Sequence, residues 1–231
     1  MSLPRRDGRP LVIGHRGASA EAPENSLEAI ELALAAGVDL VEFDVSPGLV
    51  VTHDAGGDGP MLDEVLALVA RTDAGAHADL KSPGYEQAVV DRLRRHGLAE
   101  RAVVSTAFAA VGRRVRALAP ELPVAIGYPR DRYGVSRLPW PPLLVAPGAA
   151  ALRAVMPLRI PLLLATAGAN VLALHHALCS RAAIAAAHRR GAPVLVWTVN
   201  DPQEALRLAA MGADAIVSDD PKSTLATLSG P

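Results

Sequence analysis

Short runs of apolar residues alternate along this chain with longer segments in which apolar positions recur every three or four residues. The short runs predict β-strands and the longer segments predict helices. The predicted strands are residues 11–14, 40–45, 77–80, 103–105, 124–127, 171–174, 194–198 and 215–217, with residues 49–52 as an additional extended piece. Eight main strands that alternate with helices indicate an α/β protein whose parallel sheet closes into a single TIM-type (β/α)8 barrel.

Four of the helical segments have clear ends. They are residues 26–36, 85–95, 180–190 and 202–210, and a glycine follows each of them closely, as expected where a helix ends in a left-handed residue. Asn25 precedes the first of these segments, and Glu28 lies three residues further on. This spacing resembles a capping box. The sequence leaves two interpretations of Asn25 open, a cap of this helix and a role in a functional site.

One part of the chain lacks this regular alternation. Residues 128–161 contain many prolines, including the run Leu138-Pro139-Trp140-Pro141-Pro142, and proline disrupts the helix interior. We predict a loop over a site, or a linker, in this segment. The most hydrophobic stretch, residues 160–174, is about 15 residues long and falls short of the roughly 20 that cross a bilayer. It predicts a buried helix, a turn and a strand.

The length and the charge of the chain limit its class. With 231 residues, half of them hydrophobic, it is close to the roughly 250 residues of a typical barrel, and we expect residues 1–231 to form one domain. The net charge is −1, from 23 basic and 24 acidic residues, and aromatic residues make up 3%. Such a chain has neither a global positive field nor many stacking surfaces, so we expect no nucleic-acid partner. Since its most hydrophobic stretch is too short to cross a bilayer, we also expect no stable membrane insertion.

The cysteine count and the N-terminal sequence indicate the compartment. Cys179 is the single cysteine, so there is no internal disulfide, and we expect a buried and inert thiol. The apolar run Leu11-Val12-Ile13 near the N-terminus is too short for the core of a signal peptide. We therefore expect a cytoplasmic protein.

Two predicted strands carry closely spaced carboxylates. Side chains alternate between the faces of a strand, so Glu42 and Asp44 lie on one face, and Asp79 lies on the corresponding face of the next main strand. Three carboxylates in a barrel interior need a counter-charge, which a divalent cation with oxygen ligands supplies. The alternative is salt bridges to arginine or lysine. Lys81, two residues after Asp79, is a candidate for such a bridge or for binding a phosphate oxygen.

Two histidines follow predicted strands close to these carboxylates. His15 follows residues 11–14 and precedes Arg16, whose planar guanidinium suits two phosphate oxygens. His53 closes the extended piece and is followed by Asp54, which could fix its tautomer. Phosphodiester cleavage near neutral pH needs one base and one acid, so we predict that His15 and His53 are this pair. His77 lies deeper in its strand and is predicted to be a core histidine.

These residues resemble the glycerophosphodiester phosphodiesterases, a branch of the phospholipase-C-like phosphodiesterase barrels. The similarity extends over nearly the whole chain and matches only in outline between residues 128 and 169. The motifs that carry it are Gly14-His15-Arg16-Gly17, Pro23-Glu24-Asn25-Ser26, Gly37-Val38-Asp39, Glu42-Phe43-Asp44-Val45, Val51-Thr52-His53-Asp54, Val196-Trp197-Thr198-Val199-Asn200 and the run from Gly212 to Pro221.

The resemblance implies a metal-dependent hydrolase that releases glycerol 3-phosphate and an alcohol from small glycerophosphodiesters. The implied roles are an acid–base pair, a site for Mg²⁺ or Ca²⁺, and a substrate site. His15 would be the base and His53 the acid, by analogy with related lipases. The implied cation ligands are Glu42, Asp44 and Asp79. The implied substrate contacts are Arg16 and Lys81 with phosphate and Trp197 with the leaving alcohol.

Three departures from the family pattern bear on the site. Asp79 stands where the family usually has glutamate, and Ala107 stands where it often has serine. The loops that contain Ser46-Pro47-Gly48 and residues 55–60 are shorter than usual. We expect these differences to affect the choice of cation and of the alcohol that leaves.

Three other functions remain open at the level of sequence. The first is a phospholipase-D-like enzyme or cyclising lyase that acts on lysophospholipids. The second is a barrel that binds phosphate without catalysis, and the third is an aldolase-type enzyme in which Lys81 forms a Schiff base.

Overall fold

The computed structural model describes residues 8–54, 56–129 and 142–230, and within them the chain forms a closed parallel barrel. The barrel strands are β1 (Leu11–Gly14), β2 (Leu40–Ser46), β4 (Gly75–Leu80), β5 (Ala102–Thr106), β6 (Val124–Tyr128), β7 (Val171–His175), β8 (Val194–Trp197) and β9 (Ala215–Ser218). Each strand pairs in parallel with its neighbours, and β1 pairs with both β2 and β9, which closes the barrel. The predicted TIM-type (β/α)8 barrel is confirmed.

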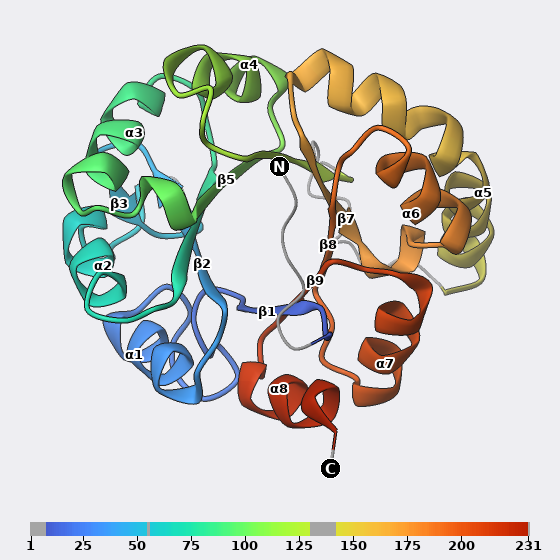
Figure 1. The fold of residues 1–231 in the computed structure, drawn as a ribbon, viewed down its shortest axis with the longest axis horizontal. Helices are drawn as coiled ribbons and strands as arrows, with labels where there is room; N and C mark the ends of the chain where they lie inside the picture. Colours follow the sequence, from blue (N-terminus) through green and yellow to red (C-terminus); the bar gives the residue numbers. More distant parts are fainter. Residues whose placement is uncertain (1–7, 55, 130–141, 231) are drawn as a thin grey trace.

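The helices surround the strands as an outer ring, which Figure 1 shows nearly end-on. They are α1 (Leu27–Ala36), α2 (Leu62–Val69), α3 (Glu86–Arg95), α4 (Ala109–Leu118), α5 (Pro142–Ala167), α6 (Arg181–His188), α7 (Pro202–Met211) and α8 (Pro221–Ser229). The predicted extra piece is β3 (Val50–Val51), which pairs antiparallel with β2 outside the parallel ring. The hairpin places the end of β3 beside the carboxyl end of β2.

Alternating side chains divide the core into two layers. One layer fills the barrel interior and includes Ile13, Val103 and Leu195. The other lies between the strands and the helices and includes Val41 and Phe43 of β2. Because Val41 and Phe43 face the helices, the carboxylates of Glu42 and Asp44 on the other side of β2 face the barrel interior, as the alternation predicts. Cys179 is fully buried, and burial raises the pKa of its thiol to about 11, as expected for an inert cysteine.

The sequence prediction fails over the proline-rich segment. Residues 142–161 were predicted to be a loop or a linker, but they belong to α5, a helix of 26 residues, while residues 130–141 of that segment lie outside the described part. Pro142 occupies the first position of α5, where proline costs no hydrogen bond. Met156, Ile160 and Leu164 of α5 are buried against the barrel. The stability gained from this packing offsets the loss of the backbone hydrogen bonds that Pro157 and Pro161 cannot make. Rules based on the local sequence do not anticipate such tertiary contacts.

Candidate active site

Six of the eight predicted site residues lie toward the carboxyl ends of β1, β2 and β4, whereas His53 follows β3 and Trp197 ends β8. In the parallel register Glu42 lies beside His77 and Asp44 beside Asp79, so these side chains share the inner face of the barrel. His15 follows β1, and its backbone N–H donates to Ser218 at the end of β9. In barrel enzymes this end of the strands carries the catalytic residues. The barrel therefore brings together residues from both ends of the chain.

Three carboxylates form a compact cluster. Glu42, Asp44 and Asp79 each offer an oxygen atom, and these atoms all lie within 4.8 Å of one another. Glu42 and Asp44 are 4% and 1% exposed. Burial, together with the charge of Asp44, raises the pKa of Glu42 to about 7. A group of hard oxygen ligands with buried negative charge fits a divalent cation.

Two cationic side chains contact the same carboxylates. Lys81 Nζ lies 2.5 Å from an oxygen of Asp44 and 2.6 Å from an oxygen of Asp79. Burial alone would lower the pKa of Lys81, but these two carboxylates raise it above its usual value. Arg16 Nε lies 2.9 Å from the other oxygen of Asp44, and Arg16 Nη1 lies 2.5 Å from Glu24. The salt bridges considered from the sequence are thus formed.

The tight turn after β1 holds Arg16 in place. Arg16 has a φ of 54°, in the left-handed region, and its backbone N–H donates to Glu42 over 2.8 Å. Gly17 follows with a φ of 87°, and a Cβ there would lie 2.4 Å from the backbone of Ala29 in α1. Glycine alone allows the turn to pack this closely against α1.

His15 has a partner that the sequence prediction missed. Its Nδ1 lies 2.6 Å from Asp219 Oδ1, and Asp219 also accepts hydrogen bonds from Ser19 and Asn200. Burial acts to lower the pKa of His15, but the bond to Asp219 and the charge of Glu42 outweigh it and raise that pKa. Burial would raise the pKa of Asp219, but bonds from His15 and Asn200 lower it to about 2. An ionised Asp219 holds the proton of His15 on Nδ1 and leaves Nε2 as the nitrogen that accepts protons.

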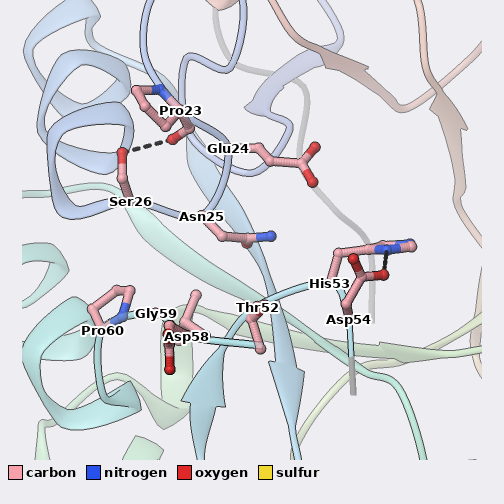
Figure 2. A pocket seen from close by; sticks show the side chains of 11 residues that line it. Pro23, Glu24, Asn25, Ser26, Thr52, His53, Asp54, Asp58, Gly59 and Pro60 are labelled. Atoms are coloured by element: carbon pink, nitrogen blue, oxygen red, sulfur yellow. Dashed lines mark hydrogen bonds and ion pairs between the residues drawn. The ribbon is translucent and has the colours of Figure 1, made fainter. Parts of the chain in front are cut away.

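His53 lies at the end of the β2–β3 hairpin beside a cavity of about 250 Å³. Its Nδ1 lies 3.1 Å from Asp54 Oδ1, and its side chain is 34% exposed. Figure 2 shows that Glu24, Asn25 and His53 extend in the same direction from two different segments. The cavity is lined by Pro23, Glu24, Asn25, Ser26, Val51, Thr52, His53, Asp54, Asp58, Gly59 and Pro60.

Of the two interpretations of Asn25, the helix cap is wrong. Ser26 is the cap, and its hydroxyl accepts a hydrogen bond from Ala29 N. Asn25 is 4% exposed, and its amide donates to Asp44 Oδ2 while its side-chain oxygen accepts from the backbone N–H of Asp44, both over 3.0 Å. Asn25 adopts a φ of 61°, which asparagine tolerates better than most residues. Asn25 therefore belongs to the site, where it orients Asp44.

His77 is buried, as predicted for a core histidine. Burial lowers its pKa to about 4, so the imidazole is neutral. Its Nε2 lies 2.8 Å from Ser105 Oγ, and Ser105 donates to Asp79 Oδ1 over 2.6 Å. Ser105, two residues before Ala107, thus holds the carboxylate of Asp79 in place.

Trp197 lies at the end of β8 on the inner face of the barrel. Its ring packs against the interior layer and lies edge-on to His175, with ring centroids 5.1 Å apart. The carboxyl ends of β7 and β8 thus present neutral rings, because burial lowers the pKa of His175 to about 4. His175 was not among the predicted site residues.

Comparisons with known proteins agree with this arrangement. The chain matches the model of the glycerophosphoryl diester phosphodiesterase family over residues 15–67 and 76–223. It is 28% identical to YhdW of Bacillus subtilis over 91% of this chain and 94% of that protein. It is 24% identical to a glycerophosphodiester phosphodiesterase of Caldanaerobacter subterraneus over 94% of this chain and 97% of that enzyme.

The fold has a close counterpart among solved structures. The phosphodiesterase OLEI02445 of Oleispira antarctica, solved in complex with its product sn-glycerol-3-phosphate, superposes with a TM-score of 0.73 at 23% identity and covers 96% of this chain and 98% of that one. The family match includes both histidines and all three clustered carboxylates. The chain belongs to the glycerophosphoryl diester phosphodiesterase family of enzymes.

Proposed function

We propose that this protein hydrolyses glycerophosphodiesters to glycerol 3-phosphate and an alcohol, with a divalent cation and with His15 and His53 as the acid–base pair. The observation that carries the proposal is the convergence of three carboxylates beside the His15–Asp219 pair, with Arg16 and Lys81 in contact. The product bound to the Oleispira relative supports the same substrate class. We also propose that residues 1–231 form a single domain.

The residues of the chain divide the chemistry between them. Nε2 of His15 accepts the proton of a glycerol hydroxyl as its oxygen attacks phosphorus, and His53 donates a proton to the alcohol oxygen as the bond from phosphorus to that oxygen breaks. The attack forms a cyclic phosphate and releases the alcohol. Water then opens this cyclic phosphate, with His53 accepting a proton from the water and His15 returning a proton to the glycerol oxygen. A cation held by Glu42, Asp44 and Asp79 would lower the pKa of the hydroxyl and neutralise charge on the phosphate.

The phosphate has candidate donors on two side chains. Lys81 has three N–H donors, and the two carboxylates in contact with it use two of them. Arg16 carries five donors in a planar fork and contacts Glu24 and Asp44. Both side chains therefore retain donors for phosphate oxygens without giving up the contacts that orient them.

A panel of glycerophosphodiesters tests the reaction. Glycerol 3-phosphate should be released in the presence of Mg²⁺, Ca²⁺ or Mn²⁺, and EDTA should stop its release. His15→Ala should lose activity by about 10²–10⁴-fold, the usual contribution of a general acid or base, while His188→Ala, a histidine in a surface pair with Asp214, should not. Accumulation of a cyclic phosphate as the final product would instead identify a cyclising lyase.

The cavity beside His53 bears on the alcohol that leaves. Among the residues that line it, Glu24, Asp54 and Asp58 are acidic, His53 is the proposed proton donor, and none is lysine or arginine. A cationic alcohol such as choline gains from these charges, so glycerophosphocholine should be hydrolysed in preference to glycerophosphoglycerol. Asp58→Asn should reduce that preference through KM for the choline diester, and Asp73→Asn, a substitution of an acidic residue outside the cavity lining, should leave it unchanged. Equal kcat/KM for both substrates in the unmodified enzyme would contradict this assignment.

A further inference from the structure

The outward face of α5 exposes large apolar side chains. Leu158 is 82% exposed and Leu162 is 67% exposed, although Met156 and Ile160 of the same helix are fully buried against the barrel. Leu158 and Leu162 lie four residues apart and so follow one another along one side of the helix. By length and composition, residues Gly148–Ala167 could also span a membrane. Since one face of α5 packs in the core, the opposite face is the part that can contact something else.

The charges of the chain are unevenly distributed along the sequence. Residues 101–200 contain 12 arginines and no lysine, with Glu121 and Asp131 as the acidic residues, whereas the remainder of the chain contains 11 basic and 22 acidic residues. The net charge of −1 therefore conceals a basic part and an acidic part. Helix α5 contacts α4 on one side and α6 on the other, and the sequences of these three helices contain no acidic residue.

The arginines lie close to the exposed leucines. Arg113 of α4 donates a hydrogen bond to the carbonyl of Thr166 in the last turn of α5, and the hydroxyl of Thr166 donates to the carbonyl of Leu162 over 2.8 Å. Arg159 follows Leu158 in α5 and lies 5.3 Å from the centre of the Tyr128 ring. Over the described residues, the arginines of α4, α5 and α6 form no ion pair with a carboxylate.

We propose that the outward face of α5, with the flanking arginines of α4, docks on the surface of an anionic lipid bilayer. Exposed leucines on one side of a helix with cations around them match the two attractions of such a surface, apolar insertion at the headgroup boundary and the charge of anionic lipids. The buried face of α5 stays in the barrel, so the helix lies on the surface and does not cross it. This inference is independent of the proposed reaction.

The same charges argue against a second copy of this chain as the occupant. In a symmetric dimer the same patch meets itself, so the arginines of one copy would face those of the other. Like charges across an interface oppose association. A bilayer with acidic lipids instead offers negative charge to the arginines and an apolar layer to the leucines.

Sedimentation with vesicles tests the docking surface. The intact protein should bind vesicles of phosphatidylcholine mixed with phosphatidylglycerol much more tightly than vesicles of phosphatidylcholine alone, and added salt should weaken the binding. Leu158→Ser with Leu162→Ser should weaken it at least tenfold. Arg113→Gln with Arg159→Gln should weaken it about twenty-five-fold, since each basic residue near such a surface contributes roughly fivefold. Leu206→Ser is the matched control, because Leu206 is 43% exposed but lies on α7.

The outcomes distinguish a lipid bilayer from a second copy of the chain as the partner of this face. Retained hydrolysis of a water-soluble diester by all variants shows that they are folded, so a selective loss of vesicle binding supports the proposal. Equal binding to both vesicle types, or unchanged binding by the leucine variant, overturns it. A dimer that the leucine substitutions convert to a monomer, with no binding to vesicles, also overturns it and identifies a second copy as the occupant.

Discussion

Asp219, which lies 204 residues after His15 in the chain, determines which ring nitrogen of His15 carries the proton. The sequence places His15 at the end of the first strand and Asp219 directly after the last, and the closure of the barrel makes these strands neighbours. Because the prediction treated each histidine together with nearby carboxylates, it assigned Asp54 to His53 and assigned His15 no partner. An acidic residue after the final strand of a closed barrel was the signal that could have found Asp219.

Substitution of Asp219 should shift the pH dependence of the reaction. The bond to Asp219 raises the pKa of His15, so Asp219→Asn should lower it. A base acts in its unprotonated form, which then persists to lower pH, and the acidic limb of kcat/KM against pH should move to lower pH. The maximal rate should fall about tenfold or more, because the imidazolium formed in the reaction loses its counter-charge.

Asp214→Asn provides the matched control for this shift. Asp214 pairs with His188 over 2.7 Å at the surface, so the variant removes another carboxylate from another Asp–His pair. Its pH profile should match that of the unmodified enzyme. An acidic limb that stays in place in Asp219→Asn would show that His15 is not the base.

The carboxylate cluster should bind a cation in a pH-dependent manner. The pKa of Glu42 is raised to about 7 in the absence of a cation, and a cation must displace the proton that Glu42 then carries. Affinity measured by calorimetry should therefore fall as pH drops through about 7, by up to about tenfold per pH unit. Glu42→Gln should abolish tight binding, whereas Asp63→Asn, at the surface carboxylate paired with Arg92, should not change it. Binding by Glu42→Gln with unchanged affinity would place the cation elsewhere.

The turn that leads into α1 illustrates how element boundaries carry function. Asn25 and Ser26 are both suitable caps, and the residue types alone do not decide between them. Asn25 is drawn away from the helix because its side chain matches both the backbone and the carboxylate of Asp44 on β2. The helix itself was predicted correctly, and the contact that selects the cap is tertiary.

Alanine at each of these neighbouring positions should separate stability from activity. Ser26→Ala should lower the free energy of unfolding by about 1 kcal/mol, the usual value of a helix cap, and lower kcat/KM much less than Asn25→Ala does. Asn25→Ala should lower kcat/KM by at least tenfold, because Asp44 loses the amide that orients it. Denaturant unfolding and steady-state kinetics measure the two effects. Equal loss of activity in both variants would mean that Asn25 acts through the helix alone.

Helix α5 marks the limit of local sequence rules at the element scale. Its prolines indicated an irregular segment, yet Met156, Ile160, Leu164 and Ala167 pack on the barrel at helical spacing. The prediction gave more weight to the prolines than to this spacing. In the structure, the apolar contacts with the barrel outweigh the local preference.

At the scale of the whole molecule, the repeating alternation of strands and helices was sufficient to predict the barrel. The number of strands implies closure, and closure places the acid–base candidates and the carboxylates on one end of the sheet. What the alternation could not supply are contacts between distant segments, such as Ser105 with Asp79 and Asn200 with Asp219. These depend on the register of neighbouring strands, which the pattern of apolar residues does not specify.

The barrel is closed by few residue pairs between β1 and β2, and this junction can be used to test whether the chain unfolds as one domain. Strand β1 pairs with β2 through two residue pairs, whereas β2 pairs with β4 through six. Asp39, directly before β2, supports this seam: its Oδ2 accepts from Val12 N over 2.7 Å and lies 2.6 Å from Arg9 Nη1. The side chain of Asp39 is 4% exposed, so its removal leaves a largely buried cation and a backbone N–H without their acceptor.

Asp39→Ala should therefore destabilise the entire molecule. Loss of one partner of a buried pair costs about 3 kcal/mol, which lowers Tm by about 6–12 °C for a domain of this size. Asp63→Ala, at a carboxylate that is 40% exposed, should cost less than about 1 kcal/mol. If the chain is one domain, it should unfold in a single cooperative transition. Circular dichroism and tryptophan fluorescence should then report the same lowered midpoint. Two separate transitions in Asp39→Ala would instead show that the β1–β4 side unfolds independently of the β6–β9 side.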